Sequence, residues 1–349
     1  MRSFAAALVF CAFGASLSGQ ALAANVLVGG HGTGYTPSKT LTGKLYFKPV
    51  VKADVLPDDY DLRDLGLVTP VTDQGQCGSC WAFGSTSAFE GALLKSSAGS
   101  FDLSEQQIVS CDTSFQGCGG GDYAFDFMIQ NGQALEKDFP YQASDSSCPK
   151  NLKAAAKATS WAYVGTQGTG PTVDELRQSI FDHGVVAISV AADDWSDAPS
   201  SGVFTECSSS NVDHLVSVVG WHKQKDGTYT FLVKNSWGPS WGNKGYIEMA
   251  LGCDSLGSDA AFVVAANTPK PPRARLPSQV FTAFNSPTTV GVHPEAGVTY
   301  EWTDAQGKVV GTDSFLDIQP TATETFKLQS KGDTGVSTSM VKVVVETQE

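Results

Sequence analysis

The spacing of hydrophobic and polar positions changes along this chain, from helix-like in the first half to strand-like in the second. Between positions 79 and 95 the pattern predicts a helix that begins near Cys80. Its apolar face is Ala82, Phe89, Ala92 and Leu93. Ser104 opens a capping-box pattern, Ser-Glu-Gln-Gln, which predicts a second, short helix through position 109. The first half of the chain is therefore expected to be mainly helical.

The second half of the central region carries short apolar runs that are typical of strands. These runs cover 185–190, 215–219, 229–233 and 245–249. Helices followed by strands indicate an α+β domain, with a helical half, a β-barrel-like half and a cleft between them.

A change in composition marks the end of this region. Residues 267–277 hold four prolines and three basic residues, which predicts an extended linker. Short runs with period-2 alternation follow, at 298–302, 314–318, 325–328 and 341–345. Residues 278–349 are therefore predicted to form a small all-β sandwich, with Trp302 as a core residue. This module resembles immunoglobulin-like or PKD-like domains, and its role is either a spacer or binding to a protein, a polysaccharide or a surface.

Length and charge narrow the class of protein. With 349 residues and 41% hydrophobic residues, the chain can form about two domains with buried cores. Its 36 acidic and 23 basic side chains give a formal net charge of −13. Such a chain repels phosphate backbones and anionic lipid, so we expect no nucleic-acid partner.

The N-terminus indicates export. Arg2 precedes an uncharged apolar run, and Ala21-Leu-Ala23 fits a cleavage site, so residues 1–24 are predicted to be a signal peptide. No later stretch reaches the length of a membrane span. We therefore expect a secreted or periplasmic protein, with residues 25–55 as a short leader. Seven cysteines remain after the signal peptide, and an odd number in an exported chain indicates one free thiol.

The densest motif is Gln74-Gly-Gln-Cys77-Gly-Ser-Cys80-Trp81. His214 follows Cys80 by 134 residues, and the segment Asn235-Ser-Trp-Gly238 begins 155 residues after it. Between them lie Ser110-Cys-Asp112 and Gly117-Cys-Gly-Gly-Gly121, and Leu56-Pro-Asp-Asp-Tyr-Asp-Leu-Arg63 precedes the motif. In this order and spacing, residues 56–266 resemble a papain-like cysteine peptidase. The resemblance implies the papain-like two-subdomain fold.

The chemistry of these residues agrees with that resemblance. A thiolate is the nucleophile, and Cys80 at a helix N-terminus is placed where negative charge is favoured. His214 can act as base toward the thiol and as acid toward the leaving amine. The resemblance implies that Asn235 orients His214, that Trp237 shields their hydrogen bond, and that Gln74 contributes to the oxyanion hole. The predicted reaction is endopeptidase hydrolysis of protein or peptide substrates through a Cys80 thioester.

The resemblance also implies substrate-binding residues and disulfides. The backbone of Gly120 and Gly121 would pair with substrate, beside Asp213. Asp122 would lie at the wall of the pocket for the second residue before the scissile bond, where it favours a basic or polar side chain unless it points to solvent. The implied bridges are Cys77–Cys118, Cys111–Cys148 and Cys207–Cys253.

The remaining histidines and one tryptophan are interpreted as ordinary structural residues. They are His31, His183, His222, His293 and Trp241. With His214 as the one histidine assigned to the active site and no multi-histidine cluster, we expect neither a metal nor an organic cofactor. We also expect a monomer.

The leader is much shorter than the helical prosegments of papain-like zymogens. We hypothesise that residues 45–55 inhibit the enzyme in part. No histidine lies between Cys118 and Cys148, and nothing is inserted between Gln74 and Cys80, which favours an open cleft. Two other functions remain open: acyl transfer from the same cysteine to an amine, and a non-catalytic binding protein whose working part is the β-sandwich.

Overall fold

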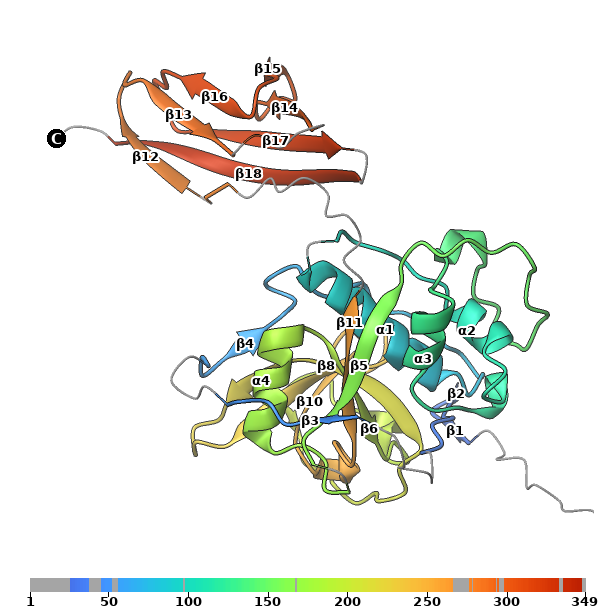
Figure 1. Ribbon diagram of the computed structural model, residues 1–349. Coiled ribbons are helices and arrows are strands. Elements are labelled where there is room, and N and C mark those ends of the chain that lie inside the picture. The colour runs from blue at the N-terminus through green and yellow to red at the C-terminus, as the bar shows by residue number, and fades with distance from the viewer. Residues whose placement is uncertain are drawn as a thin grey trace, which may run out of the picture.

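The computed structural model describes residues 26–37, 45–51, 56–96, 98–166, 168–265, 276–277, 279–292, 294, 298–332 and 335–346. The predicted signal peptide and most of the predicted linker lie outside these residues. Figure 1 shows a large domain of helices and strands and a smaller all-β module, and each has its own hydrophobic core. The predicted fold class, an α+β domain followed by all-β structure, is confirmed.

Helix α1 (Cys80–Lys95) runs through the core of the large domain. It is apolar or small on almost every face, which is the pattern of a fully buried helix. Two glycines let it lie directly on neighbouring segments: a Cβ on Gly84 would be 2.9 Å from Leu215 Cγ, and one on Gly91 would be 2.3 Å from Val185 Cγ2. This close packing fixes the position of Cys80, the first residue of the helix.

Three shorter helices complete the α structure among the described residues, together with 3-10 turns. They are α2 (Glu105–Cys111), α3 (Phe125–Gln130), α4 (Val173–His183), η1 (Gly117–Gly119), η2 (Glu136–Asp138), η3 (Trp195–Asp197) and η4 (Cys253–Ser255). The capping box predicted for α2 forms only in part. Ser104 Oγ accepts from the Gln107 N–H at 3.0 Å, but Gln107 Oε1 accepts from Ala134 N–H instead of returning to the cap. A full capping box forms instead at the start of α4, between Thr172 and Glu175.

A largely antiparallel sheet forms the other half of the large domain. In the described residues its order is β3-β5-β11-β6-β8-β9-β10-β7, and β4 adds to β8. Its strands are β3 (Tyr46–Phe47), β4 (Tyr60–Asp61), β5 (Ala158–Val164), β6 (Val186–Val190), β7 (Val203–Phe204), β8 (His214–Lys223), β9 (Tyr229–Lys234), β10 (Tyr246–Ala250) and β11 (Ala260–Ala265). Strand β8 is buried from His214 to Trp221 and packs on α1, so it is a rigid support for its first residue.

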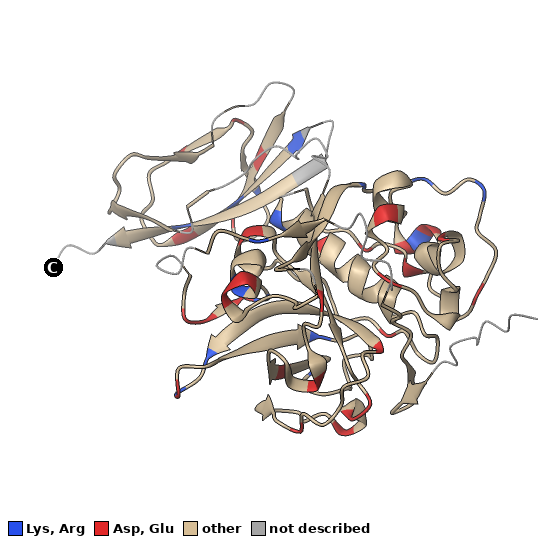
Figure 2. Ribbon diagram, turned by 60° about the horizontal axis from the view of Figure 1, so that its bottom comes forward, with Lys and Arg blue, Asp and Glu red and all other residues tan. Residues whose placement is uncertain are grey.

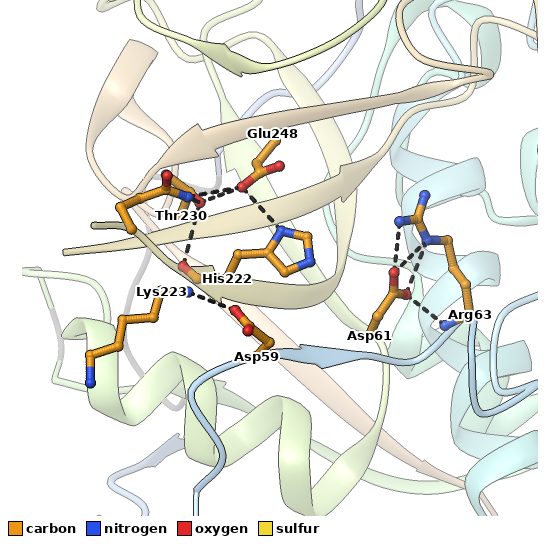
Figure 3. Close-up of polar contacts among 8 residues, drawn as sticks. Asp59, Asp61, Arg63, His222, Lys223, Thr230 and Glu248 are labelled. Carbon is orange, nitrogen blue, oxygen red and sulfur yellow. Dashed lines mark hydrogen bonds and ion pairs between the residues drawn. The ribbon is translucent and has the colours of Figure 1, made fainter. Parts of the chain in front are cut away.

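Figure 3 shows polar contacts around the start of the domain, of which the one from Asp59 reaches β8. Asp61 accepts two-pronged hydrogen bonds from Arg63, at 2.7–3.0 Å. The carboxylate of Asp59 accepts from the backbone N–H of Lys223, and His222 Nδ1 lies 3.1 Å from Glu248 Oε1. His222 therefore has the structural role that was expected for it.

The C-terminal module consists of two sheets among the described residues. One has the order β12-β18-β17-β14-β15 and the other pairs β13 with β16. The strands are β12 (Gln279–Ala283), β13 (Thr288–Gly291), β14 (Thr299–Thr303), β15 (Val309–Gly311), β16 (Phe315–Ile318), β17 (Glu324–Gly332) and β18 (Gly335–Glu346). Trp302 is fully buried in the core of the module, and its indole N–H donates to the Asp313 carbonyl at 2.9 Å.

Three disulfides lie in the large domain, and they join the pairs that the resemblance implies: Cys77–Cys118, Cys111–Cys148 and Cys207–Cys253. Among the described residues Cys80 is the cysteine left as a free thiol. Figure 2 shows the acidic positions of the large domain mainly on its helices and connecting segments, with most strands free of them, and basic positions between them. In the parts of the chain described, no helix is both long and apolar enough to cross a bilayer.

Candidate active site

Cys80 and His214 meet where the helical half and the sheet half of the domain face each other. Cys80 is the first residue of α1, and His214 is the first residue of β8. The Cys80 Sγ atom lies 4.0 Å from the carbonyl oxygen of Asp213, the residue before His214. Both the thiol and the imidazole are completely shielded from solvent. Two residues far apart in the sequence are thus brought together by the packing of α1 on β8.

The ring of His214 is held by Asn235. His214 Nε2 lies 2.8 Å from Asn235 Oδ1, an oxygen that also accepts from the Ser236 N–H at 2.7 Å. Because Oδ1 is an acceptor, Nε2 carries the proton in the neutral ring, and Nδ1 is left with its lone pair. In this part of the structure Nδ1 is buried and has no hydrogen-bond partner. His214 is therefore placed to accept a proton at Nδ1.

Tryptophan rings enclose this pair. The Trp237 ring centroid lies 4.9 Å from that of His214, and Trp195 approaches the imidazole edge-on at 6.2 Å. Trp241 packs against both tryptophans and donates its indole N–H to the Trp195 carbonyl at 2.8 Å. Excluding water strengthens the hydrogen bond between His214 and Asn235. Trp241 has the core role that was expected for it.

Gln74 is fixed on the same side of the cleft. Its Oε1 accepts from Ser236 Oγ at 2.6 Å, and its backbone N–H donates to the Ser236 carbonyl. The amide Nε2 is thereby directed toward the loop before Cys80, where it donates to the Cys77 carbonyl at 3.0 Å and to the Gly32 carbonyl at 2.8 Å. A side-chain N–H held in this way can stabilise a negatively charged oxygen.

The Gly32 carbonyl, which accepts from Gln74 Nε2, belongs to the leader, and the leader runs through the cleft. The backbone N–H groups of Gly34 and Tyr35 both donate to the Asp213 carbonyl, at 3.0 and 2.7 Å. Gly121 N–H donates to the Gly34 carbonyl at 2.9 Å, and Thr36 N–H donates to the Gly121 carbonyl at 2.9 Å. The leader therefore uses the backbone groups that the resemblance assigned to substrate.

Glycines in the leader make this path sterically accessible. A Cβ atom on Gly34 would be 2.0 Å from the Gly78 carbonyl oxygen, and one on Gly32 would be 2.6 Å from that of Cys77. On the other side, Gly120 has φ +114°, and a Cβ atom placed on it would be 2.4 Å from the Gly34 carbonyl oxygen. The sequence-based hypothesis assigns partial inhibition to residues 45–55, of which 52–55 lie outside the described residues. Among the described residues, the segment that crosses the cleft is 26–36. Tyr46 and Phe47 instead extend the sheet beside β5.

Burial sets the protonation states of the pair in this leader-bound form. Loss of solvation raises the pKa of the Cys80 thiol to about 12, because the thiolate has too little water around it. Burial also lowers the pKa of His214 to about 4, against the opposing effect of its hydrogen bond to Asn235. At neutral pH the pair is therefore a neutral thiol and a neutral imidazole.

This state predicts a pH dependence for the intact chain. Since only the thiolate reacts with iodoacetamide, alkylation of Cys80 should rise steadily between about pH 6 and pH 10, without a plateau. After the leader is cut away, water reaches the pair, and alkylation should become nearly independent of pH around neutrality. Mass spectrometry of the Cys80 peptide measures both profiles. If the alkylation rate of Cys80 in the intact chain reached a plateau around neutral pH, the assignment of a neutral thiol would be contradicted.

The structure places two further residues that the sequence analysis interpreted. His31 is half-buried beside the site: its ring stacks on Trp237 at 5.4 Å, and its Nδ1 lies 3.4 Å from Asp73 Oδ1. Asp122 does not point to solvent. It is buried and accepts from the Tyr123 N–H at 2.8 Å. Since the leader occupies the cleft, side chains at its margin are covered.

The other two histidines lie apart from these contacts or outside the structure. His183 stacks on Phe262 with ring centroids 3.8 Å apart, at the end of α4. His293 lies outside the described residues. Sequence reasoning missed two polar residues of the cleft: Ser236, which orients Gln74, and Asp259, which contacts Tyr35. Ser236 lies inside the quoted Asn235–Gly238 motif, whereas nothing in the sequence around Asp259 marks it.

Comparison with known proteins decides the family. The family profile described as "Papain family cysteine protease" matches residues 56–265, more than half of the chain. This chain belongs to the papain family. The prediction of a papain-type cysteine peptidase is therefore confirmed at the level of family and enzyme class. The match excludes the leader and the C-terminal module.

Individual relatives agree with this assignment. A cathepsin L-like peptidase of Aedes aegypti is 41% identical over 231 residues, which are 62% of this chain and 67% of that protein. Vignain of Ricinus communis is 40% identical, over 66% of this chain and 64% of its own length. This papain-family chain thus spans about two thirds of the length of these curated relatives.

Solved structures show the same fold. Digestive procathepsin L2 from Tenebrio molitor larval midgut superposes with a TM-score of 0.61 and 30% identity, over 68% of this chain and 79% of that one. The bromelain protease of Ananas comosus, in complex with the E64 inhibitor, gives a TM-score of 0.53 and 30% identity. It covers 60% of this chain and 99% of the bromelain chain.

Proposed function

We propose that this protein is an exported cysteine endopeptidase, made in a latent form, in which Cys80 is the nucleophile and His214 the general base and acid. The observation that carries the proposal is the arrangement at the cleft. A free thiol at the N-terminus of a buried helix lies 4.0 Å from the carbonyl oxygen of the residue that precedes His214. The Nε2 of that histidine is bound to Asn235, and its Nδ1 is unpartnered among the described residues. The assignment of these roles also rests on the family.

The reaction follows from these atoms once the leader has left. His214 Nδ1 takes the proton of the Cys80 thiol, and the sulfur forms a bond to the carbonyl carbon of the substrate. The oxygen gains the electron pair of the carbonyl π bond and is stabilised by Gln74 Nε2 and the Cys80 backbone N–H. The imidazolium then gives its proton to the amine as the C–N bond breaks. Water, deprotonated by His214, hydrolyses the thioester and regenerates the thiol.

The leader is proposed to hold the enzyme inactive. It occupies the Gln74 donor with the Gly32 carbonyl and the backbone of Gly121 and Asp213 with residues 34–36. Substrate needs the same donors and acceptors, so leader and substrate exclude each other. The proposed inhibitor is thus residues 26–36, in contrast to the longer helical prosegments of related zymogens.

Export is supported by the disulfides and by the N-terminal sequence. Three disulfides lie in the large domain, and such bonds persist in oxidising compartments. We infer that the protein is secreted or periplasmic and acts on protein or peptide substrates outside the cytoplasm. The C-terminal module keeps the two roles expected for it, a spacer or a domain that binds protein, polysaccharide or a surface.

The test uses the full chain with residues 52–55 replaced by the recognition sequence of a site-specific protease. After folding and cutting, a mixed fluorogenic peptide library should be hydrolysed in mild reductant. If an added amine captures the acyl group in preference to water, the protein is an acyl transferase instead. If neither product forms while the leader peptide is seen to dissociate, the alternative of a non-catalytic binding protein is favoured.

A milder change tests the role of Asn235. Asn235→Ala removes the acceptor that orients His214, so kcat should fall by about 10²-fold, with KM little changed, since misplacing a catalytic group by about 1 Å has an effect of that size. Steady-state kinetics of the cut enzyme measure this. Asn131→Ala, at an exposed position at the end of α3, is the matched control and should keep wild-type kcat. An equal kcat for both variants would contradict the proposed role.

A further inference from the structure

The side chain of Tyr35 ends on a carboxylate at the bottom of the cleft. Its hydroxyl lies 3.1 Å from Asp259 Oδ1 and 3.0 Å from Oδ2, and the side chain is almost completely buried. Tyr123, from the wall of the cleft, donates to Asp259 Oδ1 at 2.6 Å. Two phenol groups therefore converge on one carboxylate, one from the leader and one from the domain itself.

The domain holds this carboxylate in a fixed position. Asp259 directly precedes β11, and its backbone N–H donates to Ser189 Oγ at 3.0 Å, while that hydroxyl lies 3.2 Å from the Asp259 carbonyl. The walls are aromatic: the Tyr123 ring meets Tyr35 edge-on at 5.8 Å and Tyr163 edge-on at 5.5 Å. The result is a pocket with apolar walls and a polar end.

The leader fills this pocket from a position that substrate must also use. Tyr35 forms a β-bridge with Gly121, whose backbone is proposed to pair with substrate. A substrate residue beside Gly121 therefore presents its side chain to the same pocket. When the leader leaves, Asp259 loses the hydrogen bond from Tyr35 and keeps that from Tyr123. A buried acceptor that loses its donor has an energetic cost until a new donor arrives.

We propose that Asp259 is a specificity-determining residue that selects tyrosine at the substrate position beside Gly121, which by the family resemblance is the second residue before the scissile bond. The proposal rests on the proposed function. The phenol of the substrate takes the place of the Tyr35 hydroxyl on Asp259. Phenylalanine fits the same aromatic walls but leaves the carboxylate without its second donor, so it is discriminated against.

A neutral phenol suits this pocket better than a cation does. Burial, together with nearby Asp122, raises the pKa of the Asp259 carboxyl, against the hydrogen bonds from Tyr123 and Tyr35. A guanidinium or ammonium group would have to give up its hydration among aromatic rings. The phenol of Tyr35 already meets both oxygens without placing a charge in the pocket. Basic side chains are therefore the alternative class that the test must include.

The test compares peptides that differ only at the second residue before the scissile bond, where they carry tyrosine, phenylalanine, leucine or arginine. With the cut enzyme, kcat/KM for tyrosine should exceed that for phenylalanine by at least about tenfold. In Asp259→Ala the ratio should fall to about one, with phenylalanine hydrolysed as well as before. Asp226→Ala, in an exposed turn where that carboxylate accepts hydrogen bonds from Thr228, is the matched control and should keep the wild-type ratio.

The outcomes separate this inference from the proposed function. If the enzyme is active but hydrolyses tyrosine and phenylalanine peptides equally, or prefers arginine, the inference is overturned and the proposed function stands. The same holds if the preference for tyrosine over phenylalanine survives in Asp259→Ala. If no peptide is hydrolysed, the proposed function fails. The contact is then tested in the intact chain: Tyr35→Phe should speed hydrogen exchange of the leader amides by about tenfold, and unchanged exchange overturns the inference.

Discussion

Replacing Cys80 with alanine should reduce kcat/KM for peptide hydrolysis by about 10⁴-fold or more, because removing the nucleophile leaves only binding and oxyanion stabilisation. The substitution deletes one buried sulfur atom and should leave the fold intact. Hydrolysis of the peptide library by the cut enzyme measures the effect. Since the three disulfides do not involve Cys80, non-reducing peptide mapping provides the folding control.

The outcome also distinguishes hydrolysis at this site from hydrolysis by a contaminating protease. When Cys80→Ala and wild type are purified in the same way, their kcat/KM values must differ by the expected factor of about 10⁴. If the variant keeps activity within about tenfold of wild type, the observed hydrolysis does not proceed through a Cys80 thioester. A variant that loses activity but retains its three disulfides and its leader exchange pattern supports the assignment of the nucleophile.

Gly34→Ala should activate the intact chain. The added Cβ would lie 2.0 Å from the Gly78 carbonyl oxygen, a backbone atom that cannot move without displacing the loop before Cys80. The leader must therefore leave the cleft. We expect hydrolysis by the uncut chain, and alkylation of Cys80 at neutral pH, to rise by about 10²-fold, since the competing strand no longer fits.

Gly30 provides the matched control within the same leader. It has φ +90°, and nothing lies within 4 Å of a Cβ placed there. Asparagine tolerates positive φ better than other side chains, so Gly30→Asn should stay latent. If Gly34→Ala is as inactive as wild type while cutting at 52–55 activates both, the leader does not inhibit through this contact. If Gly34→Ala misfolds, cutting the wild-type chain alone still tests inhibition.

The sequence predicts the main elements and the order of the active-site residues well. Helix α1 begins at Cys80 as predicted, and strands β6, β8, β9 and β10 each contain most of the run that predicted them. Buried helices and strands can be recognised in the sequence because burial requires long apolar stretches. The C-terminal strands β14, β16, β17 and β18 are instead predicted by period-2 alternation, and Trp302 lies in the core of this module as expected.

The path of the leader could not be predicted in this way. The Gly29–Gly34 stretch has no hydrophobic period, and its position depends on hydrogen bonds to the backbone of Asp213 and Gly121, far away in the sequence. Glycine-rich segments are consistent with flexibility and with close approach between two backbones, and only the tertiary structure distinguishes these. Asp259 is similar: one acidic residue before a strand acquires its role from Tyr35 and Tyr123.

The complete burial of Cys80 under the leader has a consequence for how the protein is made. Under the proposed export, a chain with one free cysteine beside six disulfide-bonded ones among the described residues risks joining the wrong sulfur atoms while its disulfides form. A shielded thiol whose pKa is raised to about 12 is a poor partner for thiol–disulfide exchange. In the proposed latent form the leader thus acts as a protecting group in the synthetic chemist's sense: it masks one sulfur while the other six are oxidised, and its proposed removal is the deprotection step.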